Sequence, residues 1–593
     1  MARPLELPGA RNSWFSLGRR AAHRLLMAGR MRLLALLLLA LVACADTSGP
    51  DEEWGMDGPL EPLPPPGKED SQFRRGMLIA TNTTRTQVWT ARNRWEDTET
   101  AAARKAGLAW GENSGLTWDA KYAAWIDSLE WVPAVDNYST TVMLTTPWGK
   151  TLPSPYLECA EMALFLRITF AAWYELPLQF EAMSNGRRVY FGHFGVRTSS
   201  GRFAQSPEFG IQYRDYTKST SWQTSWPKDA TLRTRRLWGG VDEQPELGED
   251  QVFGAYVDEI QLNKRAGYFT VLALNYLASA NLADTANTYN VVPEAVRSGD
   301  VLLERWQRSG IGHTLVIKEV VPISDTSLDV TTISGSMPRR QGVRQSGQSS
   351  KSYFTSQYTG GNEISSDGVP YSKLGGGLKR FRVTKNVGGY WTNTWMAADE
   401  AHWINSIDYE RIGARPPRFQ ALLGQVSPQQ MRAELLTQIA DARHHLEQYP
   451  ASCAARERRE TAFAALYELS ARDFGESKAE VDDQYRDLAD YVFGELEYTQ
   501  SKTCCWNSST SAMYELVMAK AEADLADADS RGVCERPTVF AARSDGYQLW
   551  ADYAASVGRG AQWRSWSEDE SCPQRDVAAD TEAPLSATPY CAP

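Results

Sequence analysis

Two residues far apart in the sequence carry side chains that together are able to cut an amide bond. Cys159 opens a stretch with apolar groups at helical spacing, and His313 opens the apolar run 314–317. The thiolate is the reactive form of cysteine, and a helix N-terminus and a nearby imidazolium lower the thiol pKa from about 8.5 to roughly 3.5–7.5. This pair predicts covalent catalysis, in which the cysteine attacks a carbonyl and the histidine moves the proton.

One helix and the strands that follow it must position this pair. Residues 155–180 carry apolar groups at helical intervals, so we expect Cys159 in the first turn of a largely buried helix. Three runs rich in β-branched residues follow at 296–306, 310–320 and 327–337, and we expect them to be strands of one sheet. At the start of the second strand, His313 is in a position that can face the helix.

These passages resemble the papain-like cell-wall peptidases of the NlpC and CHAP type. The likeness rests on Cys159 at the head of its helix and on Arg297-Ser298-Gly299-Asp300 followed by Gly312-His313, a "GD-apolar, GH-apolar" pair of strands. It implies that Cys159 forms an acyl-enzyme and that His313 acts as general base and then as general acid. In these families a polar residue on the next strand holds the imidazole. Ser334 and Ser336 are the candidates there, and we assign Ser334.

Other interpretations stay open. Transglutaminase-like enzymes have the same Cys-then-His order, and Asp329 is the candidate for the aspartate that they carry on the following strand. A buried free cysteine in an apolar helix is common and inert, and a histidine at a strand start can be structural. The alternatives to an enzyme are therefore a catalytically inactive papain-like protein that binds peptide or glycan, or a structural lipoprotein that recruits a protein partner.

The N-terminus predicts export. A basic start at residues 30–32, a short apolar run and small residues at its end are typical of a signal peptide, which we place at 1–43, with Met27 or Met31 as a possible true start. Residues 41–44 resemble a bacterial lipobox. This likeness implies that Cys44 is lipidated and anchors the mature chain to a membrane of the cell envelope, in the periplasm or at the outer-membrane surface. The apolar run is too short for a comfortable membrane span.

The cysteines divide into groups with different expected roles. The chain has eight, and six of them lie beyond residue 450, which in an exported protein predicts up to three disulfides. Cys159 is then the thiol left without a structural role. A zinc site built from 504–505 and 444–445 is an alternative, but these residues lack the usual ligand spacing.

Composition and patterning suggest three parts after the signal peptide. Residues 44–76 are acidic and rich in proline, as in a disordered tether. We expect an α+β papain-like domain over 77–425, with a large insertion at about 181–290, in which the nucleophile helix packs on an antiparallel sheet. Residues 426–593 are predicted to form an all-α domain with disulfides. Within the α+β domain, 339–375 is polar and reads as a mobile loop.

The charge balance and the remaining motifs exclude several function classes. A net charge of −11 and a pI near 5.3 leave no basic surface for nucleic acid. No metal triad emerges from the six histidines, and no cofactor motif is implied. Envelope peptides, peptidoglycan peptides above all, are the substrates that the family resemblance suggests.

Overall fold

The computed structural model describes residues 71–79, 84–136, 139–204, 206–238, 242–308, 312–324, 326–336, 339–424, 427–497, 501–506, 508–542 and 548–566. The predicted signal peptide, Cys44 and most of the predicted tether lie outside these ranges. Strand β1 (Arg74–Leu78) pairs with β18 (Tyr390–Thr394), so regular structure begins before residue 77. Within the ranges described, no helix is both long and apolar enough to cross a bilayer.

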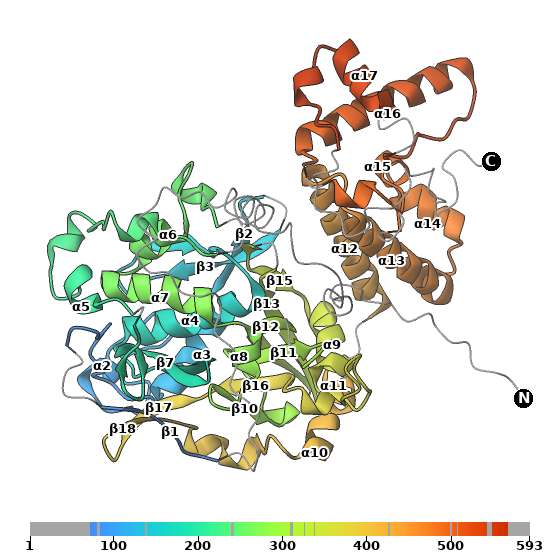
Figure 1. Cartoon of the computed structure of the whole chain (residues 1–593). Coiled ribbons are helices and arrows are strands. Elements are labelled where there is room, and N and C mark those ends of the chain that lie inside the picture. Colours follow the sequence, from blue (N-terminus) through green and yellow to red (C-terminus); the bar gives the residue numbers. More distant parts are fainter. Residues whose placement is uncertain are drawn as a thin grey trace, which may run out of the picture. The chain divides into compact units, whose positions relative to one another are not determined.

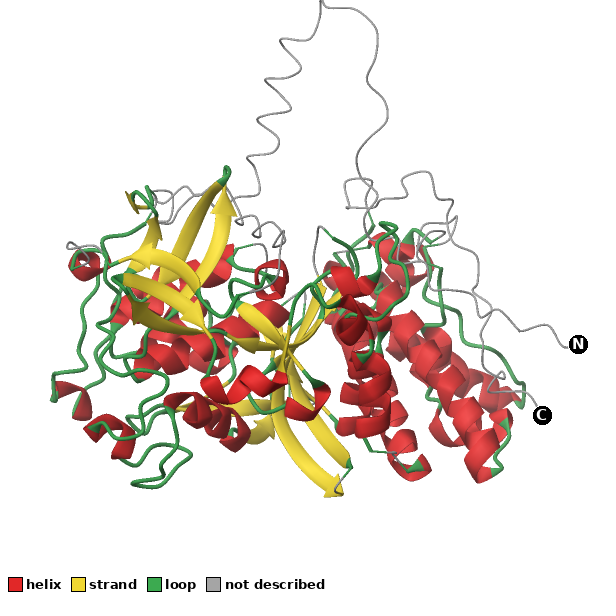
Figure 2. Ribbon diagram, turned by 90° about the horizontal axis from the view of Figure 1, so that it is seen from below, coloured by secondary structure: helices red, strands yellow, loops and turns green. Residues whose placement is uncertain are grey.

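A ten-stranded sheet forms the centre of the α/β part of the chain (Figure 2). Nine strands follow the order β19-β10-β16-β11-β12-β13-β15-β3-β2, β4 pairs with β3, and every neighbouring pair is antiparallel. The bounds are β2 Glu130–Pro133, β3 Thr140–Thr145, β4 Thr151–Pro153, β10 Thr288–Val291, β11 Val301–Arg305, β12 Gly312–Ser324, β13 Ser327–Ser334, β15 Val343–Gln345, β16 Gly377–Phe381 and β19 Trp403–Ile404.

Strands β11, β12 and β13 are the three β-rich runs that the sequence predicts. They form a continuous antiparallel meander, in which Glu304 lies opposite His313 and Leu315 lies opposite Ser334. Because side chains alternate between the two faces of a strand, Glu304, His313, Leu315 and Ser334 share one face of the sheet. This register brings the predicted histidine and serine together.

Helix α4 (Cys159–Trp173) packs on the opposite face of the same sheet (Figure 1). Val316 and Ile333 belong to the hydrophobic core of this helix. Leu315 and Ile317 belong instead to a second core, which α11 (Arg415–Leu422) shares. The sheet therefore has a helix layer on each side, and the strand that carries His313 separates the two cores.

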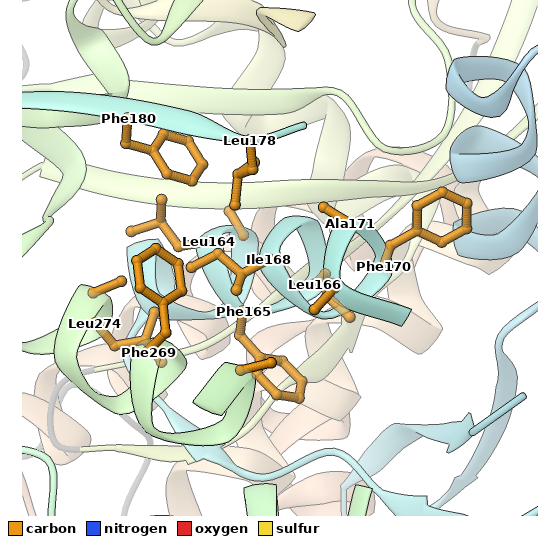
Figure 3. Close-up of a cluster of buried hydrophobic side chains, with 14 of the residues drawn as sticks. Leu164, Phe165, Leu166, Ile168, Phe170, Ala171, Leu178, Phe180, Phe269 and Leu274 are labelled. Atoms are coloured by element: carbon orange, nitrogen blue, oxygen red, sulfur yellow. The ribbon is translucent and has the colours of Figure 1, made fainter. Parts of the chain in front are cut away.

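The apolar spacing of α4 is accounted for by its burial on nearly every side. Figure 3 shows its side chains packed against residues of α7 (Lys264–Tyr276) and of the segment that begins β6 (Gln179–Ser184). Leu164, Phe165 and Ile168 are almost completely buried. Burial of such side chains contributes about 1.5–3 kcal/mol each, which fixes the helix and hence the position of its first residue.

Helix α3 (Trp118–Ser128) packs its aromatic residues against α4. Trp118, Tyr122 and Trp125 lie on one face of the helix, and all three are buried against Phe170 of α4. These rings therefore belong to the core and do not form an exposed surface.

The predicted insertion contains its own small sheet and several helices. The sheet has the order β6-β7-β8-β9, with β7 Arg187–Gly192, β8 Gly195–Thr198 and β9 Gly201–Arg202. Its helices are α5 Phe209–Gln212, α6 Phe253–Ile260, α7 and α8 Ser279–Ala283. Since α7 packs on α4, the insertion completes the core around α4.

Five further strands and two short helices belong to the α/β part. β17 (Val383–Val387) joins β1 and β18 in a three-stranded sheet, and β5 (Tyr156–Leu157) pairs with β14 (Arg340–Gln341). The two helices are α2 Ala101–Arg104 and α10 Tyr409–Gly413.

Residues 339–375 are not the loop that their polar composition suggests. They contain β14, β15 and helix α9 (Gly347–Thr355), which begins after the N-cap Ser346. Phe354 is fully buried in the core on the α9 side of the sheet, and Ser350 bonds Thr332 of β13. The helix is held by one buried apolar residue and an N-cap. A single apolar residue in a polar segment gives no helical periodicity, so the sequence pattern does not predict this helix.

Beyond residue 427 the described chain is helical. The helices are α12 Pro428–Gln448, α13 Cys453–Leu469, α14 Lys478–Tyr485, α15 Leu488–Val492, α16 Ser511–Arg531 and α17 Gln548–Ser556. A disulfide joins Cys453 to Cys504, and Cys505 and Cys534 are disulfide-bonded as well. In the part of the chain that the structure describes, Cys159 is the free cysteine.

The predicted class, mixed α and β with antiparallel sheets and a disulfide-bearing helical region, is thus confirmed.

Candidate functional site

Cys159 is the first residue of α4, as the sequence predicts. The preceding Glu158 is the N-cap, and its backbone N–H donates to Oε2 of Glu161 at 2.8 Å. Cys159 is partly exposed, and its Sγ lies 3.8 Å from the carbonyl oxygen of Gly312 in β12. The start of the helix and the start of the histidine strand are therefore in direct contact.

The thiol lies beside the backbone on both sides of His313. Its hydrogen bond goes to the carbonyl of Gly312, and the N–H groups of Thr314 and Ala160 lie where they favour the thiolate. In this way Sγ reaches the residues immediately before and after the histidine. The ring itself does not face the thiol: His313 shares its sheet face with Ser334 and packs on Tyr353 of α9, whereas α4 lies on the other face. The expectation that His313 faces the helix is therefore wrong, and no hydrogen bond joins Sγ to the ring within the described ranges.

The His313 ring is held by Ser334. Nε2 lies 3.1 Å from Ser334 Oγ, and the same hydroxyl is 3.1 Å from the carbonyl oxygen of Gly335. A hydroxyl has one hydrogen to donate, and the Gly335 carbonyl can only accept. The hydroxyl therefore donates to Gly335, Nε2–H donates to Ser334, and Nδ1 is the unprotonated nitrogen of the neutral ring.

Burial makes the Cys159 thiol harder to ionise, which is the opposite of the sequence-based expectation. Its pKa is raised to about 11, mainly because burial disfavours the charged form. The carboxylates of Glu158 and Glu161 raise it further, while the N–H groups of Thr314 and Ala160 act in the other direction. The N–H of Ala160 at the helix terminus does lower the thiol pKa, as expected, but burial raises it by more.

The His313 imidazole is also neutral at pH 7. Burial lowers its pKa to about 4, and the charge of Arg340 acts in the same direction. The ring lies against Tyr353 of α9, with 5.5 Å between the ring centroids. At rest the thiol and the imidazole are thus both neutral and lie on opposite faces of the sheet, without a thiolate–imidazolium pair.

A buried ion pair fixes the first turn of α4. Arg339 donates from Nε to Oε2 of Glu161 at 2.8 Å and from Nη2 to Oε1 at 2.7 Å. Nη2 also donates to the backbone carbonyl of Trp238 at 2.6 Å. Arg339 thus links the first turn of α4 to Trp238 in the predicted insertion. Sequence reasoning missed Glu158, Glu161 and Arg339, although the pattern ECAE around the cysteine was available as a signal.

The Gly-Asp motif that supports the family resemblance has a structural role here. Asp300 accepts from Arg380 Nε at 2.7 Å and from Nη2 at 2.8 Å, and it also accepts from the backbone N–H of Arg297. Gly299 has φ +85°, and a Cβ there would lie 2.7 Å from the Tyr122 ring. The motif forms a tight turn that sets the start of β11.

The alternative third residue and the alternative metal site are not assembled. Asp329 lies opposite Val321, eight residues along β12 from His313, or about 26 Å at the rise of an extended strand. Cys504 is in a disulfide. Among the described residues, no group of three or more His, Cys, Asp or Glu side chains is arranged to hold a metal ion.

The chain was compared with protein families, curated proteins and solved structures. No protein-family model, no curated protein and no solved structure matches the chain.

Proposed function

We propose that the α/β part of this chain is a cysteine hydrolase or acyltransferase that acts on an amide bond. Cys159 is the nucleophile, His313 is the general base, and Ser334 orients the ring. The observation that carries the proposal is the contact of Cys159 Sγ with the backbone beside His313, on a strand whose histidine is bonded to Ser334 of the next strand.

The resting protonation states favour one order of steps. In the proposed reaction the His313 ring turns from the α9 face toward the thiol, and, because the thiol is neutral, Sγ attacks the substrate carbonyl carbon as its proton passes to Nδ1. The carbon–nitrogen bond then breaks, and the imidazolium returns the proton to the leaving amine. Water, or an acceptor amine, attacks the resulting thioester with His313 again as base, and Cys159 leaves as the thiol.

The helix N-terminus supplies a place for the negative charge that develops on the carbonyl oxygen. The first N–H groups of an α-helix have no partner within the helix. The N–H group of Ala160 lies at the sulfur, and an oriented N–H donor of this kind stabilises an oxyanion. The terminus therefore serves the transition state even though it does not ionise the resting thiol.

The sequence sets the cellular context of the proposal. A signal peptide and lipidation at Cys44 would anchor the enzyme to a membrane of the bacterial envelope, in the periplasm or at the outer-membrane surface. Peptide chains of peptidoglycan are the amide substrates that such an enzyme would meet. The acidic balance of the chain gives no reason to propose nucleic acid as a partner.

A second candidate is a catalytically silent protein that keeps this arrangement and binds envelope peptide, glycan or a protein partner. The thiol pKa raised to about 11 favours it, and so does the absence, among the described residues, of a hydrogen bond between Sγ and the ring. In the resting state the thiol is therefore neither ionised nor hydrogen-bonded to a base.

Hydrolysis of defined peptidoglycan peptides by the purified chain tests the proposal. New amines are measured and the products are identified by mass spectrometry for wild type, Cys159→Ser, His313→Ala and the exposed control His402→Ala. The proposal predicts cleavage by wild type and by the control, and loss of about 10²-fold or more in the two site variants. Binding of the peptides without any cleavage would favour the silent protein. Equal release by all four proteins would contradict the roles of Cys159 and His313.

A further inference from the structure

A small cavity lies between α3, α4 and the turn that leads into β11. Its volume is about 10 Å³, and its lining includes Asp119 and Tyr122 of α3, Arg167 of α4 and Arg297 of the turn. A buried water molecule needs about 10–15 Å³ of such space and two to four polar partners. The cavity therefore has the size of one water molecule.

Two buried polar groups at this cavity have no hydrogen-bond partner among the described residues. They are the hydroxyl of Tyr122 and Nε–H of Arg167, and the two residues are 4% and 1% exposed. The guanidinium lies over the tyrosine ring, with 4.6 Å between its Cζ and the ring centroid. A buried donor without an acceptor is costly, so a partner that satisfies both groups would stabilise the fold.

Asp119 offers the acceptor that such a partner needs. Its Oδ2 accepts from Nη2 of Arg297 at 2.5 Å, whereas its Oδ1 lies 3.9 Å from Nη1 of Arg167, beyond hydrogen-bond range. Oδ1 therefore has lone pairs that can accept a hydrogen. Two donors and one acceptor thus line a space in which only a molecule that both accepts and donates satisfies all three.

We infer that this cavity is a binding site for one structural water molecule. The water accepts hydrogen bonds from the Tyr122 hydroxyl and from Nε of Arg167, and it donates one to Oδ1 of Asp119. It links α3 to the middle of α4, the helix that begins at Cys159. The inference is independent of the proposed function, because these three side chains take no part in the proposed reaction.

The charges around the cavity favour water over an anion. Three arginines and three aspartates are paired there, namely Arg167, Arg297, Arg380, Asp119, Asp300 and Asp399. Their formal charges cancel, so an anion in the cavity would be a buried charge without a counter-ion, which is costly. A neutral molecule that can both donate and accept avoids this cost.

Diffraction from crystals of the full chain, grown with sodium bromide and measured above the bromine absorption edge, tests the assignment. We expect one water peak at about 2.7–3.2 Å from both the Tyr122 hydroxyl oxygen and Nε of Arg167, without an anomalous signal. A cavity without density between these two side chains would overturn the inference. An anomalous peak there would overturn it as well, because it would identify an anion site.

Thermal unfolding of Tyr122→Phe gives a second test, in which the sign of the change separates a filled cavity from a dry one. If water fills the cavity, the variant loses a hydrogen bond, and we expect the Tm of the α/β part to fall by about 1–3 °C. If the cavity is dry, the variant loses an unpaired buried hydroxyl. The Tm would then equal or exceed that of wild type, which would overturn the inference.

Two further tyrosine variants calibrate this measurement. Tyr289→Phe loses a hydrogen bond of 2.6 Å to Oδ2 of Asp399, so its Tm should also fall. Tyr409 is exposed, and Tyr409→Phe should leave the Tm unchanged. The inference predicts that Tyr122→Phe behaves like Tyr289→Phe in sign, and a result like that of Tyr409→Phe would contradict it.

Discussion

The Oγ of Ser334 lies 3.1 Å from Nε2 of His313, and the same hydroxyl faces the carbonyl of Gly335. The serine thus works as a relay between a ring N–H and a backbone acceptor. This fixes the tautomer in which Nδ1 is free to accept a proton. A serine in this arrangement does what an amide or carboxylate would do for orientation, but it adds no charge.

Removal of the Ser334 hydroxyl should slow the chemistry of Cys159. In Ser334→Ala the ring loses the acceptor of its Nε2–H, so the tautomer with Nδ1 free is no longer favoured. We predict that alkylation of Cys159 at neutral pH falls by about tenfold. Ser327→Ala, at the other end of the same strand, is the matched control. Equal rates in both variants would show that Ser334 does not act on the pair.

Removal of the Glu158 charge should have the opposite effect. Glu158 raises the pKa of the Cys159 thiol, and a glutamine keeps the size and the polar oxygen of the N-cap. We predict faster alkylation of Cys159 in Glu158→Gln above about pH 7, where the carboxylate is ionised because its own pKa is raised to about 7. The exposed Glu130→Gln serves as control. A slower reaction than wild type would contradict this electrostatic account.

His193 should make the fold less stable in acid. It is 1% exposed, its Nδ1 contacts the backbone of Leu178, and burial lowers its pKa to about 4. The unfolded chain, with a pKa near 6.5, binds the proton first, so stability falls as the pH drops from about 6.5 to about 4. The group accounts for about 3 kcal/mol over this window.

Urea unfolding of wild type and His193→Gln at neutral and acid pH checks this sign. The stability advantage of wild type should shrink as the pH falls, whereas the exposed His402→Gln should keep a constant difference from wild type. A pH-independent difference for His193→Gln would mean that the ring has the same pKa in the folded and unfolded chains.

The Cys453–Cys504 disulfide should stabilise the helical region. It spans 51 residues, and closing a loop of this length in the unfolded chain is worth about 4 kcal/mol. We predict that the double variant Cys453→Ser/Cys504→Ser lowers the urea midpoint of helical unfolding by a corresponding amount. The α/β part should keep its Cys159 reactivity. An unchanged midpoint would indicate that the unfolded chain is already constrained without this bridge.

Sequence periodicity predicted the elements that carry the pair, because both lie in strongly apolar segments. The run from Cys159 has the spacing of a buried helix, and the runs through His313 and Ser334 have the composition of strands. The register between the strands followed from the structure alone. It is this register that places Ser334 on the ring.

The sequence pattern could not predict the pKa of the Cys159 thiol. A cysteine at a helix start suggests a lowered thiol pKa, but the pKa also depends on burial and on Glu158 and Glu161, whose distances no pattern shows. Helix α9 was missed for a related reason, since its apolar anchor Phe354 is one residue in a polar segment. In both places tertiary contacts outweigh the local signal.

The most direct test of the central claim is detection of an acyl group on Cys159. The full chain is mixed with an activated phenyl ester, quenched in acid, digested and analysed by mass spectrometry, with His313→Ala in parallel. The account predicts a thioester on Cys159 that forms quickly in wild type and about 10²-fold more slowly without the histidine. Acylation at the same slow rate in both proteins, or none at Cys159, would contradict it.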